Sequence, residues 1–409
     1  MIDVKTKAFW RATGALGIAS FVIFANIYFP QPLLPMFTNE FGISETTSSL
    51  TISIALFVLG ISFFFYTALS DAYGRRNIIF VAMGLGIIGT FAISQAPTFA
   101  WLLAARVFQA AALAGIPVAA MAYMSEEYKV RAMTAAVGIY ISCNSVGGMS
   151  GRVLSGVFTE VWDWRTAFLA VTAVSVLLFL LVYVLLPPSR QFTSRSFHFT
   201  EVWKDNIAHL KNPTLRYAYL IGGLHFFVFI GIFNFITYYL HGEPFHVSTA
   251  ILGLLFLTYA AGTVSSTLAG KLTQKWKQTT CMFIGILLMT ISLLLMLLPS
   301  FVVIITALLL LSFGFFFAHS CSSAWVTKHA ETAKASASGL YLTSYYLGGS
   351  LGSVYYGWLW SMYGWIGVVL GSLIILGVTA TCTKELFSIE VADRERNISP
   401  SQKPVEAHK

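Results

Sequence analysis

Four ionisable side chains within apolar stretches are the residues of this chain best placed to do chemistry. Arg106 lies in WLLAARVFQAAALAG and Arg152 in a glycine-rich stretch, while His225 and His319 each lie among apolar residues. A charged group in such surroundings is costly and therefore marks a candidate functional site. Imidazole titrates near neutral pH, so the two histidines are candidate proton carriers. A structural role in packing is the alternative for each of the four.

The acidic residues avoid these stretches, and this absence bears on the ligand. Asp71 and Glu126 stand near the ends of apolar segments and are the remaining candidate proton carriers. Two arginines without a buried acid favour an anionic or neutral amphipathic ligand over a lipophilic cation. Several polar or charged side chains in the apolar stretches are candidates for binding it, with packing as their alternative role: Asn26, Gln31, Asn144, Arg152, Asn234, Tyr238, Tyr341 and Tyr345.

The composition places nearly the whole chain in a lipid bilayer. Of 409 residues, 57% are hydrophobic and only 10% are charged, whereas soluble domains carry about 25% charged residues. The four cysteines have neither metal-ligand nor disulfide-framework spacing, so we expect no metal and no cofactor. The first apolar stretch is too long for a cleavable signal and is read as a membrane span.

Apolar segments of about 20 residues are long enough to cross a bilayer as helices. The sequence predicts an all-α membrane protein with twelve such spans, near 12–36, 49–70, 77–96, 99–125, 134–158, 165–187, 214–240, 249–270, 280–298, 301–326, 337–360 and 364–384. Prolines 30, 32 and 35, and Gly115 with Pro117, are expected to interrupt spans 1 and 4.

The basic residues fix the expected orientation. With the N-terminus inside, the cytoplasmic loops and tails hold 22 of the 25 Lys and Arg, which predicts both termini in the cytoplasm of a cell membrane, inner or plasma. The basic balance then needs no nucleic-acid partner. Residues 1–187 and 214–385 form two six-helix halves, joined by a linker over 188–213, in which 199–211 can form a membrane-surface helix. Residues 386–409 are expected to be a disordered cytoplasmic tail.

One glycine pattern occurs in both halves. Gly138, Gly147, Gly151 and Gly156 recur as Gly339, Gly348, Gly352 and Gly357, with the same spacings of 9, 4 and 5 at an offset of 201. Glycines four apart let helices approach closely in lipid. The sequence therefore predicts a duplicated protein in which Gly138, Gly147, Gly151, Gly156, Gly348 and Gly352 serve helix packing and gating.

The loop TALSDAYGRRN, residues 67–77, carries a further motif. It resembles the G-x-L-x-D-R-x-G-R-R/K loop of the major facilitator superfamily, with matches that include Asp71, Gly74, Arg75 and Arg76 and departures at Thr67 and Ala72. Arg75 and Arg76 can bridge to carboxylates of neighbouring helices. We expect Asp71, Gly74, Arg75 and Arg76 to form a conformational latch between the halves.

Two span motifs extend the resemblance over the whole chain. The glycines from Gly138 to Gly156 are similar to the span-5 pattern of the superfamily's drug:proton antiporters with twelve helices, although Arg152 replaces its proline. Arg106 and Gln109 match the span-4 R-x-x-Q-G motif, which implies a role for Arg106 in proton coupling. Other runs, including YFPQPLLP, look like the YnfM-like branch of efflux permeases.

The resemblance implies a monomeric secondary transporter and no enzyme. The expected function is proton-coupled efflux of small amphipathic drugs or metabolites by alternating access, with drug resistance as a consequence. Export of a carboxylated metabolite or metal chelator is one alternative and a lipid flippase is another. An uptake symporter is a third, which the span-5 glycine pattern disfavours.

Overall fold

The computed structural model describes residues 1–192, 207–330 and 334–398, and these are almost entirely helical. The helices run in the order α1 (Lys7–Tyr28), α2 (Leu34–Phe41), α3 (Glu45–Tyr73), α4 (Arg75–Ser94), α5 (Phe99–Leu113), α6 (Gly115–Glu127), α7 (Val130–Val161), α8 (Trp164–Leu185), α10 (Pro213–His241), α11 (Thr249–Leu254), α12 (Ala260–Leu272), α13 (Gln278–Leu295), α14 (Phe301–His329) and α15 (Lys334–Ile398), with short 3-10 helices η1 (Gln31–Leu33) and η2 (Leu255–Tyr259). The all-α prediction is confirmed.

Ten helical segments of the described chain are long and apolar enough to cross a membrane. This number differs from the expected twelve at two places. The α7 helix carries Arg131, Arg152 and many small polar residues, and it is absent from the ten. The α15 helix counts once, although Gly364 interrupts its helical backbone at φ +60° and divides it into two straight parts.

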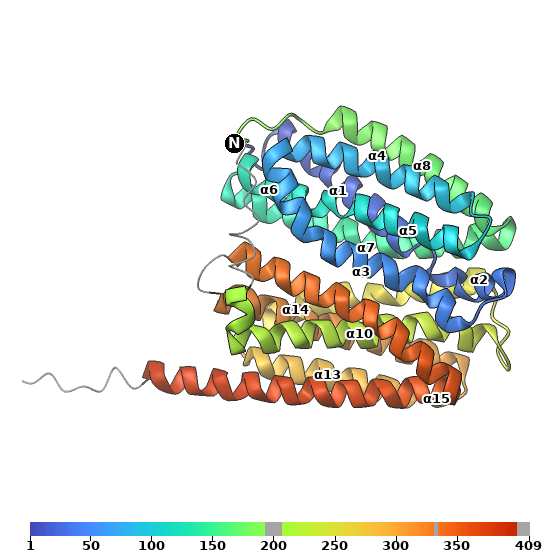
Figure 1. Ribbon diagram of the computed structural model, residues 1–409. Helices are drawn as coiled ribbons and strands as arrows, with labels where there is room; N and C mark the ends of the chain where they lie inside the picture. The colour runs from blue at the N-terminus through green and yellow to red at the C-terminus, as the bar shows by residue number, and fades with distance from the viewer. Residues whose placement is uncertain (193–206, 331–333, 399–409) are drawn as a thin grey trace, which may run out of the picture.

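The helices gather in two groups that lie side by side (Figure 1). We call α1–α8 the N-terminal group and α10–α15 the C-terminal group. Within the groups, α1 packs on α7 and α10 packs on α15, while α3 contacts α15 and α7 contacts α11 across the boundary. Most residues of α1 and of α10 are buried, whereas few residues of α8 are. The first helix of each group is therefore central, and α8 is peripheral.

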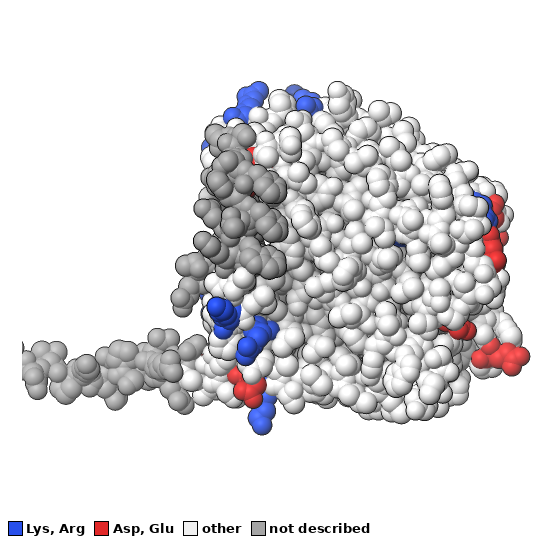
Figure 2. Space-filling view, viewed as in Figure 1, with Lys and Arg blue, Asp and Glu red and all other residues white. Residues whose placement is uncertain are grey.

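The two ends of the bundle differ in charge (Figure 2). Most basic side chains visible in this view lie at the left end, where the chain begins, and we call this the basic end. Most visible acidic side chains lie at the right end beside α2, which we call the far end. The helices thus run between two chemically distinct surfaces, as expected for a protein that spans a bilayer.

Breaks in the helices occur where the sequence predicts them and at one further place. The α1 helix ends at Tyr28, just before Pro30, and the α5 helix gives way to α6 at Ala114. The span that follows α10 is also broken, because η2 separates α11 from α12. No glycine or proline inside 254–260 signals this third break.

The end of the chain corrects one expectation. Residues 386–398 were expected to be disordered, but α15 continues as a helix to Ile398. The buried Glu390 explains part of this order, because it accepts hydrogen bonds from the backbone N–H groups of Gln278 and Thr279 at the start of α13. A carboxylate at a helix N-terminus is stabilising. Of the expected surface helix, 207–211 are helical, and the rest lies outside the described residues.

Candidate functional site

Arg106 on α5 is fully buried and binds the broken end of α1. Its guanidinium donates four hydrogen bonds, to the carbonyl oxygens of Thr51 (3.0 Å), Asn26 (3.3 Å) and Ile27 (2.7 Å) and to the Gln109 side chain. In a continuous helix the Asn26 carbonyl would accept from the N–H of residue 30. Residue 30 is proline and has no N–H, so Arg106 supplies the missing donor.

A buried polar network surrounds this end of α1. Gln109 donates to the Thr90 hydroxyl (2.7 Å), and Thr90 donates to the Asn26 side chain (2.8 Å). The Asn26 amide in turn donates to Ser175 on α8 (3.1 Å). Asn26, predicted as a ligand-binding residue, therefore uses its side chain to join α1 to α4 and α8. All of these residues belong to the N-terminal group.

Arg152 on α7 lies in a cage of aromatic rings. Its guanidinium carbon is 3.9 Å from the centre of the Tyr28 ring, 4.7 Å from that of Phe256 and 4.8 Å from that of Tyr259. Gly148 leaves room for it, since a Cβ there would lie 3.3 Å from one guanidinium nitrogen. Aromatic faces attract a guanidinium, so the cage holds the charge without a carboxylate.

A chain of hydrogen bonds leads from Arg152 across the boundary between the groups. Arg152 Nε donates to the side-chain oxygen of Gln31 (2.7 Å), and the Gln31 amide donates to that of Asn234 (2.7 Å). The Asn234 amide then donates to Ser353 on α15 (3.0 Å). Arg152, Gln31 and Asn234 are all buried. We call this chain the polar bridge. It brings together three of the predicted ligand-binding residues.

Rows of aromatic rings connect the cage to His319. The Tyr259 ring lies 4.9 Å from Phe229, which stacks on Phe315 at 3.9 Å, and Phe315 stacks on His319 at 5.8 Å. The His319 ring is 3.0 Å from the hydroxyl of Tyr341 and contacts the Tyr345 ring at 4.8 Å. Predicted residues His319, Tyr341 and Tyr345 thus form one cluster in the C-terminal group.

The other predicted residues lie outside these two clusters and differ in their hydrogen bonding. His225 is fully buried, and neither ring nitrogen has a hydrogen-bond partner in the described chain. Tyr238 lies toward the far end, where its hydroxyl is 3.2 Å from that of Thr38 on α2. Asn144 on α7 is half-buried and makes no side-chain hydrogen bond to any described residue.

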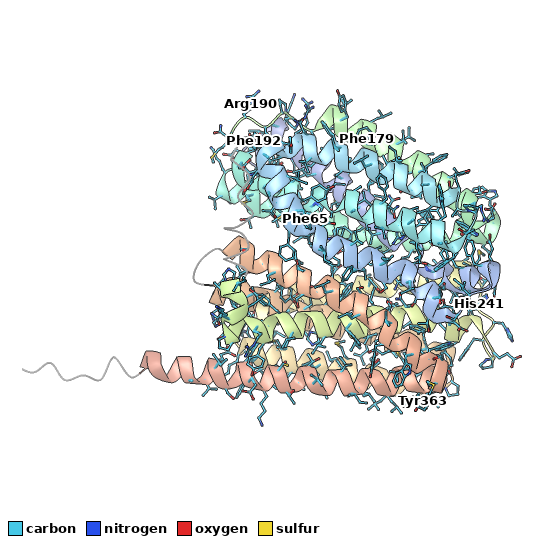
Figure 3. The ribbon with its side chains drawn as sticks, in the orientation of Figure 1. Phe65, Phe179, Arg190, Phe192, His241 and Tyr363 are labelled. Carbon is cyan, nitrogen blue, oxygen red and sulfur yellow. The ribbon has the colours of Figure 1, made fainter. Side chains whose placement is uncertain are left out.

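A pocket of about 360 Å³ opens at the far end, between α2, the end of α10 and the start of α11. Its lining includes Glu40 and His241, and Figure 3 shows His241 at this end. The Glu40 carboxylate accepts hydrogen bonds from the Trp164 indole and from Arg165. The His241 ring contacts the Val247 carbonyl at 3.1 Å. The pocket is thus separate from Arg152 and its cage.

The described contacts of Arg75 and Arg76 all lie within residues 70–192. Arg75 pairs with Asp71 (2.5 Å) and with Glu126 on α6 (2.7 Å), and its guanidinium lies 5.5 Å from the Phe192 ring. Arg76 donates to the Leu186 carbonyl (3.0 Å). The expected bridge to a neighbouring carboxylate is present, but the described partners place no latch between the two groups. Gly74 has φ +91°, a conformation that favours glycine.

The repeated glycines make repeated contacts. On α7, Gly147 and Gly151 lie against the backbone of Phe21 and Ala25, and on α15, Gly348 and Gly352 lie against that of Gly223 and Phe227. Gly156 meets Thr249 on α11, as Gly357 meets Thr46 on α3. The expectation fails at Gly138, where a Cβ would have no neighbour within 4 Å among the described residues.

Sequence reasoning missed most of the aromatic cage. Phe256, Tyr259 and Gly148 carry no motif, Tyr28 entered only as part of the YFPQPLLP run, and aromatic residues are too frequent in this chain for any one of them to stand out. The only available signal was indirect: a buried arginine without a nearby acid requires another compensating group, and aromatic faces supply it.

This architecture defines a class of membrane protein, and the sequence comparison agrees with it. Residues 16–353 match the model of the Major Facilitator Superfamily, and the chain belongs to this family of membrane transporters. It is 38% identical to the inner membrane transport protein YnfM of Escherichia coli (strain K12) over 371 residues, which cover 91% of this chain and 88% of that protein. It is 34% identical to the MFS-type transporter YybF of Bacillus subtilis (strain 168) over 364 residues, covering 89% and 90%.

Solved structures show the same fold. The chain superposes on a bacterial homologue of the human lysosomal transporter Spinster, in its inward-facing and unoccupied conformation, with a TM-score of 0.78. The match covers 93% of this chain and 97% of the homologue at 18% sequence identity. It superposes on the human organic anion transporter MFSD10 with a TM-score of 0.70 at 15% identity, covering 92% and 99%. The expected fold class is thereby confirmed.

Proposed function

We propose that this chain exports a small amphipathic compound in exchange for protons, by alternating access. The two six-helix halves, 1–187 and 214–385, would rock against each other, with 188–213 as their linker and the protein acting as a monomer. In this proposal α7 and the two parts of α15 each cross the membrane, which gives twelve spans. The basic end faces the cytoplasm, because basic residues are retained on that side.

The polar bridge is the observation that carries the proposal. Arg152, Gln31 and Asn234 are buried where the two groups meet. Polar and charged side chains are costly to bury there and therefore mark a candidate functional site. Transporters of this architecture bind substrate near the bilayer midplane between their repeats. The hydrogen bonds of a polar site shared by both groups would change when the groups move relative to each other. Alternating access requires such a link between the site and the movement.

The distribution of contacts between the groups supports an inward-facing state. Their hydrogen bonds in the described chain extend from the middle of α3 to the far end, and include Thr343 to Gly60 (3.3 Å), Ser53 to Ser350 (2.6 Å) and Tyr238 to Glu45 (3.4 Å). The basic end of the described chain has no such bond between the groups. With that end in the cytoplasm, the far end would be the closed external side.

His319 is the preferred proton carrier in this proposal. Its ring contacts Tyr341 and Tyr345 and is joined by aromatic rings to Arg152. A titratable group this near to a substrate site can link protonation to binding. His225, Asp71 and Glu126 are alternatives, although both carboxylates are already paired with Arg75.

Everted membrane vesicles with an acidic interior test the proposal. A pH-sensitive dye should report proton release when a naphthalenesulfonate, a naphthyl quaternary ammonium or a naphthalenemethanol is added, if any of the three is a substrate. His319→Gln should lower this coupled signal at least about tenfold, since glutamine can hydrogen-bond to Tyr341 but cannot titrate.

Lys211→Gln, a change at the basic end, is the matched control and should leave the signal unchanged. Coupled transport at the wild-type rate in His319→Gln would remove His319 as the carrier. Substrate movement that never moves protons, in the wild type as well, would contradict the proposed exchange.

A further inference from the structure

Arg152 has hydrogen-bonding capacity that the protein leaves unused. A guanidinium carries five N–H donors. Arg152 uses two of them in the described chain, to Gln31 (2.7 Å) and to the carbonyl of Gly148 (2.9 Å). Arg106 uses four. The two buried arginines therefore differ: Arg106 uses nearly all of its donors, whereas Nη2 of Arg152 has no acceptor among the described residues.

The charge of Arg152 also lacks a compensating carboxylate. Among the described residues, Glu127 and Glu390 are the buried carboxylates. Each binds backbone N–H groups elsewhere, Glu127 those of Arg190 (2.5 Å) and Gln191 (2.7 Å) and Glu390 those at the start of α13. Ring faces attract the guanidinium more weakly than a carboxylate would, so a buried cation without an ion-pair partner is costly, and an anionic ligand would lower that cost.

Aromatic surface surrounds the Arg152 guanidinium and continues away from it. The rings of Tyr28, Phe256 and Tyr259 lie over the guanidinium at 3.9–4.8 Å, and aromatic surface extends from Tyr259 to Phe229 and Phe315. Planar N–H donors beside an apolar wall match a compound with one anionic group and an apolar or aromatic body. A lipophilic cation would meet a charge of its own sign.

We propose that Arg152 binds the anionic group, a carboxylate or sulfonate, of a soluble amphipathic compound whose apolar body lies on the aromatic rings. This inference rests on the proposed function, because it names the class of compound that is carried. It also predicts a link to conformation. An anion that pairs with Arg152 competes with the Gln31 side chain for Nε, and so weakens the polar bridge that joins the two groups.

Equilibrium binding to the purified chain in nanodiscs of zwitterionic lipid tests this inference without a proton gradient. The probes are 2-naphthalenesulfonate, its neutral analogue 2-naphthalenemethanol and the cation (2-naphthylmethyl)trimethylammonium. The wild type should bind the sulfonate at least about tenfold more tightly than the other two, because a charge-assisted pair with Arg152 adds to shared ring contacts.

Arg152→Gln should remove this preference, and Arg152→Lys should keep part of it because lysine retains the charge but not the planar donors. Arg190→Gln, an exposed arginine at the basic end (Figure 3), is the matched control and should bind as the wild type does. If Arg152→Gln does not fold, the comparison of three probes on the wild type still decides.

Three results would overturn the inference. The first is equal binding of the cation and the sulfonate by the wild type, and the second is an unchanged sulfonate affinity in folded Arg152→Gln. The third is displacement of the sulfonate by phosphatidylglycerol added to the nanodiscs, together with scrambling of that lipid in liposomes, which would assign the site to a lipid headgroup. Intact sulfonate binding without proton-linked transport would instead contradict the proposed exchange alone.

Discussion

At the scale of single residues, the structure separates two arginines that look alike in the sequence. Arg106 donates to the Asn26 carbonyl, which Pro30 leaves without its helical partner, and to the neighbouring Ile27 carbonyl. Arg152 lies against aromatic rings and keeps free donors. Arg106 is thus placed to stabilise the broken end of α1. Arg152 is placed to bind the anionic ligand proposed above. Any part of Arg106 in proton coupling would act through the end of α1.

Replacing Arg106 tests its structural part. Arg106→Ala leaves the Asn26 and Ile27 carbonyls buried without their charged donor, at a cost of about 1–3 kcal/mol for each. We expect a clearly lower melting temperature of the detergent-solubilised protein, measured by tryptophan fluorescence. Arg152→Gln loses fewer hydrogen bonds, so its melting temperature should decrease less. A melting temperature unchanged by Arg106→Ala would show that these hydrogen bonds contribute little.

The sequence could identify both arginines and pointed to Gln109 and Gln31, but not to their other partners. A charged residue in an apolar run is visible in any sequence. Arg106 binds backbone oxygens and Arg152 binds ring faces, and neither kind of partner has a residue type that marks it. The role of Pro30 was visible only as a break in span 1. Its consequence, an orphaned carbonyl 3.3 Å from an arginine on another helix, required the packing of α1 against α5.

At the scale of helices, the repeated glycines define two equivalent helix pairs. Gly147 and Gly151 bring α7 onto α1 at Phe21 and Ala25, and Gly348 and Gly352 bring α15 onto α10 at Gly223 and Phe227. The partners are separated by 202 residues and the glycines by 201. The duplication read from the sequence is therefore also present in the contacts.

Gly151→Ala and Gly138→Ala form a matched pair on one helix. A Cβ on Gly151 would collide with the Ala25 backbone, so the α1–α7 pair must separate, at about 1–3 kcal/mol. Gly138 faces open space, so alanine there should stabilise α7 by up to about 1 kcal/mol. Thermal unfolding in the same detergent measures both. Equal effects at the two positions would contradict the packing role of Gly151.

Spacing alone could not separate these two glycines. Both belong to the repeated pattern, and both are expected in packing on that basis. Which part of a long helix contacts a partner depends on where the neighbouring helix runs, and one sequence does not contain that information. The break at η2 was invisible for a similar reason, because residues 254–260 hold only good helix or strand formers.

At the scale of the whole molecule, the hydrogen bonds between the groups in the described chain lie from the middle of α3 to the far end. Gly156 against Thr249 and Gly357 against Thr46 form a symmetric pair of crossings there. Because each crossing joins the repeated helix of one group to the other group, the same movement would open both. The two-group arrangement was predictable from the repeat and the linker, whereas the state in which the chain is held was not.

A cross-link between the groups tests whether they must separate. The Ser53 hydroxyl lies 2.6 Å from the Ser350 carbonyl and 3.3 Å from its hydroxyl, so cysteines at both positions are close enough to join. In a background with the native cysteines replaced, oxidation of Ser53→Cys with Ser350→Cys should abolish transport in vesicles, and reduction should restore it. Ser53→Cys alone is the control. Full transport by the fully cross-linked protein would rule out movement at this contact.

The last helix has a practical consequence for anyone who wants to watch this movement. The C-terminal part of α15 projects past the other helices at the basic end (Figure 1), and Glu390 ties it to α13. This part of α15 is a continuous helix with a rise of about 1.5 Å per residue. It therefore keeps a fixed length and direction, unlike a flexible linker. A fluorophore placed near its end would follow the C-terminal group as a rigid body, and its distance to a second dye on the N-terminal group would report each cycle.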